Sequence, residues 1–243
     1  MVHSMRNVGD HLGAFFSFYP RNILKNMGLQ DIVSVLETYR GREKTMRTIQ
    51  YGLLFATPLA SRNVKAAFEV ISSQLGLSRV VLRLFDDLPM LQFSLSCGIG
   101  KKDEDDTVRT LQILNNVVDQ LYFPVEHIAW LRDVKVLRGT STGLWNISLL
   151  LWGISLCLNI LRSLRRITLL KKRNKMSSLE EKKRIEAIYT AEWLTVIMQA
   201  SDLLNALNWS SFRPWNKSFA AWQVGLFGLI SSLIGFSKLL SAN

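Results

Sequence analysis

Residues Leu144–Arg166 read LWNISLLLWGISLCLNILRSLRR, and this stretch decides what kind of fold the chain can adopt. Within this stretch the first charged residue is Arg162, and the uncharged run extends backwards to Gly139. At about 1.5 Å per residue, residues 139–161 are long enough to cross a hydrocarbon core of about 30 Å. We therefore predict a transmembrane helix here. The alternative, a central helix of a large soluble domain, is disfavoured because such helices usually expose a polar stripe.

A second uncharged run, Ser218–Ser237, lies between Lys217 and Lys238, and we predict a second transmembrane helix there. Four small residues recur on one helical face of this run: Gly225, Gly228, Ser232 and Gly235. Small residues on one face let two helix backbones approach closely, so we predict that these four mediate oligomerisation. The alternative is that they reflect the general abundance of Gly and Ser in membrane helices.

The net charge of +11 is concentrated between the two uncharged runs. Residues 162–217 hold 12 Lys or Arg and 5 Asp or Glu, whereas residues 1–143 hold 17 and 14. A basic segment beside a membrane span favours anionic lipid headgroups over nucleic acid as its partner. A solvated turn is the alternative for the most basic part, residues 162–184. Residues 185–209 are predicted to form a helix that packs on the spans or lies at the membrane interface.

Residues 1–138 are predicted to form a helical, membrane-associating region, so the fold class is all-α. The helix expected over residues 61–85 has apolar residues at a spacing of three to four, with basic residues facing away. A helix of this kind can lie in a membrane surface, although core packing is its commoner fate. The predicted membrane-binding residues of this helix are Arg62, Lys65, Phe68, Arg79, Leu82, Arg83 and Phe85.

Motifs of the common enzyme classes are missing from the sequence, which contains no nucleophile elbow, P-loop, zincin or dinucleotide-binding signature. The three histidines show no ligand spacing with Cys97 or Cys157, so we expect no metal site and no cofactor. The acidic segment KKDEDD, residues 101–106, lacks the EF-hand spacing and is interpreted as a solvated loop. We therefore do not expect an enzyme.

Several segments resemble the peroxisomal membrane protein 11 family, most closely its gamma member. They are LETYRGREKTMRTIQYG (36–52), LSRVVLRLFDDLPML (77–91), VVDQLYFPVEHIAWLRD (117–133), SDLLNALNW (201–209) and VGLFGLISSLIGF (224–236). Their order and spacing are kept from about residue 30 to residue 237. The resemblance implies a multi-pass protein of the peroxisomal membrane that promotes membrane elongation and peroxisome division, through insertion of amphipathic helices.

The resemblance also implies partners: further copies of the chain, sibling family members, tail-anchored fission adaptors, a dynamin-related GTPase and the import receptor for peroxisomal membrane proteins. It implies cytosolic termini and a matrix-facing loop, whereas the positive-inside rule predicts a cytosolic loop. Asp86 and Asp87 depart from the strongly basic remodelling helices of the family, which indicates action in hetero-oligomers. A metabolite channel and a passive scaffold for the fission machinery are the alternative functions.

Overall fold

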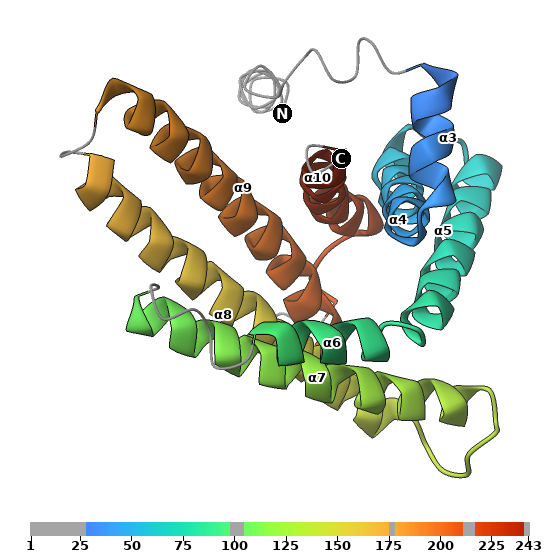
Figure 1. Ribbon diagram of the computed structural model, residues 1–243. Helices are drawn as coiled ribbons and strands as arrows, with labels where there is room; N and C mark the ends of the chain where they lie inside the picture. Colours follow the sequence, from blue (N-terminus) through green and yellow to red (C-terminus); the bar gives the residue numbers. More distant parts are fainter. Residues whose placement is uncertain (1–27, 98–104, 175–177, 211–216, 241–243) are drawn as a thin grey trace. The chain divides into compact units, whose positions relative to one another are not determined.

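The computed structural model describes residues 28–97, 105–174, 178–210 and 217–240, and every regular element in these ranges is a helix (Figure 1). The all-α prediction is therefore confirmed. The helices are α3 (Leu29–Glu37), α4 (Tyr39–Ala56), the short 3-10 helix η1 (Thr57–Leu59), α5 (Arg62–Arg83), α6 (Asp87–Cys97), α7 (Asp106–Asp133), α8 (Thr142–Asn174), α9 (Leu179–Trp209) and α10 (Ala221–Leu240).

The chain divides into two compact units, residues 1–42 and residues 43–243. In the first unit, α3 meets the beginning of α4 at Thr38, whose hydroxyl donates to the carbonyl of Val35 and accepts from the amide of Gly41. A Cβ at position 41 would overlap the Val35 carbonyl, so the close approach of the two helices at this turn depends on glycine.

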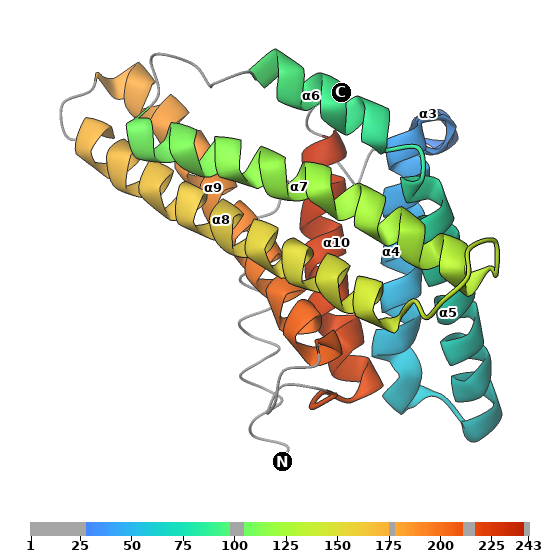
Figure 2. The same ribbon diagram turned by 90° about the horizontal axis from the view of Figure 1, so that it is seen from below.

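In the second unit, α7, α8, α9 and α10 follow one another, and each packs against the next (Figures 1 and 2). The turn between α7 and α8 uses positive φ angles at Lys135 (64°) and Gly139 (107°). The indole nitrogen of Trp145 donates to Asp133 across this turn at 2.7 Å, which ties the start of α8 to the end of α7.

Two helices, α8 and α10, are long and apolar enough to cross a membrane, as predicted. Their bounds differ from the uncharged runs. α8 begins at Thr142, because the positive φ of Gly139 is incompatible with a right-handed helix, and it continues through the cations to Asn174. α9 begins at Leu179, so most of the basic segment between the two uncharged runs is helical.

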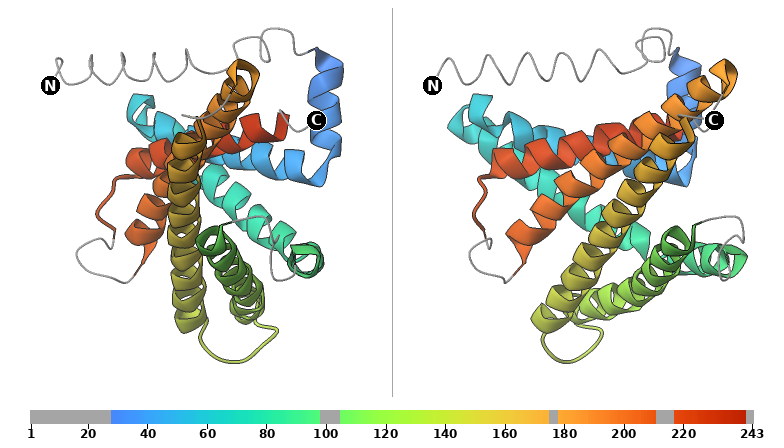
Figure 3. Two further views of the ribbon diagram at one scale, coloured as in Figure 1. Left: turned by 60° about the vertical axis from the view of Figure 1, so that its left-hand side comes forward. Right: turned by 90° about the vertical axis from the view of Figure 1, so that its left-hand side faces the viewer.

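α4, α5 and α10 lie side by side, as the views in Figures 2 and 3 show. α4 runs antiparallel to α10: Lys44 near its start lies beside Gly235, and Phe55 near its end lies beside Gly225. Residues 44–55 of α4, which fall within the predicted N-terminal region, therefore pack directly against the second candidate span.

Candidate membrane interface

Many of the side chains buried between the described helices are polar, and many large apolar side chains are exposed on the outside. Among the described residues, ten apolar and fifteen polar or charged residues are buried. Only 17% of the most apolar stretch of α8 is buried. In water the hydrophobic effect places apolar residues inside. The reverse arrangement suits a surrounding of acyl chains, where polar groups must be paired within the protein.

The apolar face of α5 points away from its neighbours. Val70 and Leu77 are 60% and 58% exposed, and Phe85, just after the helix, is 71% exposed, whereas Ser72 and Arg79 on the other face are 2% and 8% exposed. The sequence predicts an amphipathic helix, and in the structure the second half of its polar side packs against the protein through Ser72 and Arg79, whereas Lys65 and Glu69 in the first half are exposed. The apolar side is the one available to lipid.

The structure divides the predicted membrane-binding residues into two groups. Arg62, Lys65 and Phe85 are exposed, and Phe68 and Leu82 are half-buried. Lys65 lies 4.0 Å from Glu69 one turn along the helix, a surface pair of little energetic weight. These five residues remain accessible, at least in part, from outside the protein.

Arg79 and Arg83 form the second group, and both bind acids inside the protein. Arg79 donates to Glu43 and to Gln50, each at 2.9 Å, which joins α5 to α4. Arg83 makes a two-pronged ion pair with Glu126 at 2.5 and 2.8 Å, which joins α5 to α7. Membrane binding by these two arginines stays a prediction, and in the structure their guanidinium groups hold these carboxylates. Sequence spacing alone does not reveal acids that lie so far along the chain.

The small residues of α10 lie against α4 of the same chain. A Cβ at Gly225 would overlap the backbone of Phe55, and a Cβ at Gly228 would overlap the ring of Tyr51. Small residues permit close helix packing, as the sequence predicts, but here the contact is intramolecular. Oligomerisation through Gly225, Gly228, Ser232 and Gly235 stays a prediction, and it requires a second copy to bind at a face that α4 already covers.

A charged cluster joins α4, α9 and α10 at this contact. Arg47 of α4 donates to Asp202 of α9 at 2.5 Å, and to Ser231 and Ser232 of α10 at 3.0 and 3.1 Å. Its guanidinium group also lies 5.5 Å from the ring centre of Tyr51. The side chains of Arg47 and Asp202 are only 13% and 9% exposed, so this is a buried ion pair against a candidate membrane span.

A second polar cluster lies between α7 and α8. The amide oxygen of Asn115 accepts from the Ser155 hydroxyl at 3.0 Å and from the Asn159 amide at 2.9 Å. The Asn115 amide nitrogen donates to Asp119 at 2.6 Å. Ser155 and Asn159 of α8 thus face α7 rather than lipid, which explains how Asn159 is accommodated in an apolar helix.

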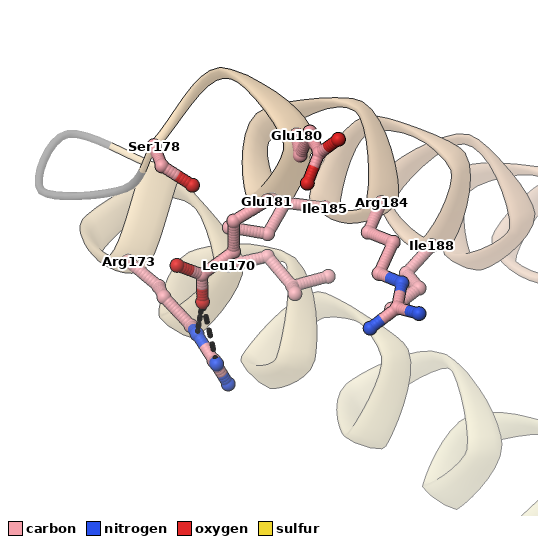
Figure 4. Close-up of a pocket in the computed structure, with 8 residues that line it drawn as sticks. All are labelled: Leu170, Arg173, Ser178, Glu180, Glu181, Arg184, Ile185 and Ile188. Atoms are coloured by element: carbon pink, nitrogen blue, oxygen red, sulfur yellow. Dashed lines mark hydrogen bonds and ion pairs between the residues drawn. The ribbon is translucent and has the colours of Figure 1, made fainter.

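The cationic end of α8 is partly neutralised by acids from other segments. Three arginines are paired: Arg165 with Asp105 at 2.7 Å, Arg166 with Glu192 at 3.0 Å, and Arg173 with Glu181 at 2.7 Å. An open hollow near the turn between α8 and α9 is lined by Arg173, Arg184, Glu180 and Glu181 among others (Figure 4). Two cations and two anions balance there, so the hollow has no excess charge for an anion. The exposed Lys172, Lys182 and Lys183 keep the surrounding surface basic.

Asp105 has a structural role that the solvated-loop interpretation of residues 101–106 missed. Its carboxylate caps α7 by accepting from the amides of Thr107 and Val108 at 3.1 and 3.3 Å. It also accepts two hydrogen bonds from Arg165, at 3.1 and 2.7 Å. The bonds from Arg165, together with those from the backbone, lower the pKa of Asp105 to about 2. Residues 98–104 lie outside the described ranges.

Within the described ranges, no three His, Cys, Asp or Glu side chains are grouped so that they could hold a metal ion. The buried acids described above are bound to arginine or amide groups. Their arrangement is that of structural pairs between helices.

Comparison with known proteins identifies the family. Residues 29–240 match the family model described as Peroxisomal biogenesis factor 11 (PEX11). Peroxisomal membrane protein 11C of Homo sapiens is 38% identical over 221 residues, which cover 85% of this chain and 92% of that protein. Peroxisomal membrane protein PMP27 of Saccharomyces cerevisiae is 26% identical over 227 residues, which cover 86% of this chain and 93% of that protein. No solved structure matches the chain.

The resemblance to the gamma member is confirmed by the similarity to the 11C proteins, of which the Mus musculus protein is also 38% identical, over 231 residues. That match covers 88% of this chain and 95% of the mouse protein. The family model spans nearly all of the described helices, from α3 to α10. This chain therefore belongs to the Peroxisomal biogenesis factor 11 family and is a protein of the peroxisomal membrane.

Proposed function

We propose that this chain promotes elongation of the peroxisomal membrane and division of the organelle, and so its proliferation, without catalysing a reaction. The observation that carries the proposal is the outward apolar surface of Phe85 and α6, which belong to the same unit as the candidate spans. Apolar side chains that enter one leaflet expand it relative to the other, which favours a curved membrane.

The wedge is assigned to Phe85, which follows α5, and to α6. Phe85, Leu88 and Leu95 are 71%, 75% and 73% exposed. In Figure 1, α10 is seen end-on whereas α6 lies in the plane of the picture, so α6 crosses the direction of α10. With α10 across the bilayer, α6 lies along the membrane surface, where exposed apolar side chains insert among headgroups. Arg79 and Arg83 have no part in this contact.

The proposed partners follow from membership of the family rather than from a contact in the structure. They are further copies of the chain, sibling members, fission adaptors with their dynamin-related GTPase, and the import receptor for peroxisomal membrane proteins. The basic surface near the turn between α8 and α9 supports anionic headgroups as a further partner. We also propose cytosolic termini, on the basis of family membership; within the second unit, Lys44 and Gly235 lie side by side and so at one face of the membrane.

A metabolite channel is the second candidate. The sequence argues against it because neither uncharged run contains an ionisable residue. The structure weakens this objection, since it brings Arg47 and Asp202 against the middle of α10 and places a polar cluster between α7 and α8. A passive scaffold remains the third, and it predicts no deformation of lipid by the protein alone.

The test uses the purified full chain in vesicles of phosphatidylcholine and phosphatidylserine, with tubulation and ion conductance measured on the same sample. The variant Phe85→Glu is expected to reduce tubulation several-fold. Leu179→Glu, at a position 77% exposed near the α8–α9 turn, is the matched control and should tubulate normally. Unchanged tubulation by Phe85→Glu would remove the wedge. Conductance without tubulation would favour the channel, and neither activity would favour the scaffold.

A further inference from the structure

We infer that α4 and α5 form a hairpin embedded in the hydrocarbon core beside α10, with lipid acyl chains as the partner of its outward face. This goes beyond the proposed remodelling role and does not depend on it. It requires only that α10 crosses the peroxisomal membrane.

The register of α4 on α10 sets the depth of the hairpin. Arg47 contacts Ser231 and Ser232, which lie at the middle of the 20-residue helix α10. At about 1.5 Å per residue, the middle is about 15 Å from either end. Tyr51 lies one turn further, beside Gly228. α4 therefore accompanies α10 through the depth of the bilayer and does not lie on its surface.

The charges of this hairpin are arranged as a bilayer requires. Arg47 at mid-depth is neutralised by Asp202 at 2.5 Å, and two serine hydroxyls accept its other hydrogen bonds. Ionisable residues inside membrane proteins face the protein interior and pair with one another in this manner. Arg79 likewise faces inwards to Glu43 and Gln50. These charges are satisfied within the protein rather than exposed to lipid.

The second arm of the hairpin, α5, is long enough to follow α4 through the bilayer. Its 22 residues measure about 33 Å, enough for a hydrocarbon core of about 30 Å. The nine residues between Glu69 and Arg79 carry no charge. Lys65 and Glu69 pair with each other near the first turns of the helix, from which a long lysine side chain can reach the headgroups.

Acyl chains are the occupant that the exposed residues favour. Ile49 of α4 is 48% exposed, and Val70, Leu77 and Val81 of α5 are 60%, 58% and 41% exposed. These residues lie on both helices of the hairpin, which packs beside the apolar helix α10. A partner protein would be expected to need one local patch, whereas these apolar residues are spread over both helices at the depth that the contact of α4 with α10 sets.

Depth-resolved fluorescence quenching of the full chain in vesicles tests this placement. A Leu77→Cys variant, made with Cys97 and Cys157 replaced by serine, is labelled with bimane and reconstituted into phosphatidylcholine. We expect strong quenching by lipid spin-labelled at mid-chain and little quenching by aqueous iodide. Leu59→Cys in the same background is the matched control, because this position is 90% exposed at the turn of the hairpin and should respond to iodide.

Each other outcome overturns the inference. Iodide quenching at position 77 would place the hairpin in water. Protection from both quenchers, with disulfide cross-links between copies at position 77, would show that a second copy covers this face. A Val70→Cys variant on the same face repeats the measurement, so failure of one variant to fold leaves the inference testable. Tubulation is not measured, so the result is independent of the remodelling proposal.

Discussion

Gly228 is the residue at which the helix contact between α4 and α10 can be tested most directly. A Cβ there would overlap the buried ring of Tyr51. We predict that Gly228→Ala destabilises the protein by roughly 1–3 kcal/mol, since added volume in a close-packed contact forces a shift of the ring or the backbone. Thermal unfolding of the detergent-solubilised protein measures the effect as a lower Tm.

Gly235→Ala is the matched control, because its Cβ would meet only the flexible end of Lys44 at 3.6 Å. Its Tm should remain close to that of the wild type. If these glycines served only a contact between copies, both variants would keep the wild-type Tm in the monomeric state. Equal and unchanged Tm values would therefore contradict the intramolecular packing.

Asp105 makes a stability contribution that depends on pH. Its pKa falls from an ordinary value of 3.8 to about 2, chiefly through the bonds from Arg165. A carboxylate with a lowered folded-state pKa stabilises the protein above its unfolded pKa, and this contribution is lost as the pH falls from about 4 towards 2. Asp105→Asn removes the ion pair but keeps a capping oxygen, whereas Asp105→Ala removes both.

Thermal unfolding at several pH values gives the measurement. At pH 7 the Tm should fall in the order wild type, Asp105→Asn, Asp105→Ala. The gap between wild type and Asp105→Asn should narrow as the pH approaches about 3, because the Asp105 carboxylate of the unfolded chain then takes up a proton, which stabilises the unfolded state. A gap that stays constant across this range would show that the ion pair with Arg165 contributes nothing.

At the scale of helices, the pair of Arg47 and Asp202 holds three elements together. Removing one partner leaves the other charge buried and unpaired, so we expect Arg47→Met or Asp202→Leu to cost roughly 3–5 kcal/mol. The double variant Arg47→Met with Asp202→Leu should be markedly more stable than either single variant, because no unpaired charge remains. Protease resistance and Tm in detergent report both effects.

The comparison of single and double variants separates a buried pair from two independent surface charges. In the second case the two single changes would each cost little, and their effects would add. Additive, small effects would show that Arg47 and Asp202 do not meet, and that α4 is not fixed on α9 and α10 in this register.

At the scale of the whole molecule, the sequence predicted the helical class and both candidate spans because those features are local. An uncharged run of 20 residues is visible without knowing its neighbours. The bounds were less accurate: the helix that starts at Thr142 extends to Asn174, since cations at its end find acids elsewhere. Positive φ at Gly139 cannot be read from composition alone.

The orientation of the amphipathic helices could not be predicted from periodicity. A repeat of three to four residues defines two faces of the helix over residues 62–83, but it does not say which face meets protein. That choice depends on partners such as Glu43 and Glu126, which lie 36 and 43 residues from Arg79 and Arg83. Arg47 and Asp202 are separated by 155 residues, so their pairing exists only once the helices have assembled.

The polar interior and apolar exterior of this bundle also constrain how the chain reaches its final state. A folded form with this surface would aggregate in water, since most of the apolar stretches of α8 and α10 are not buried within the fold. Assembly of the ion pairs and departure from the aqueous phase must therefore coincide. We therefore propose that a carrier shields the leucine-rich segments of the polypeptide between the ribosome and the organelle and releases them on delivery to lipid.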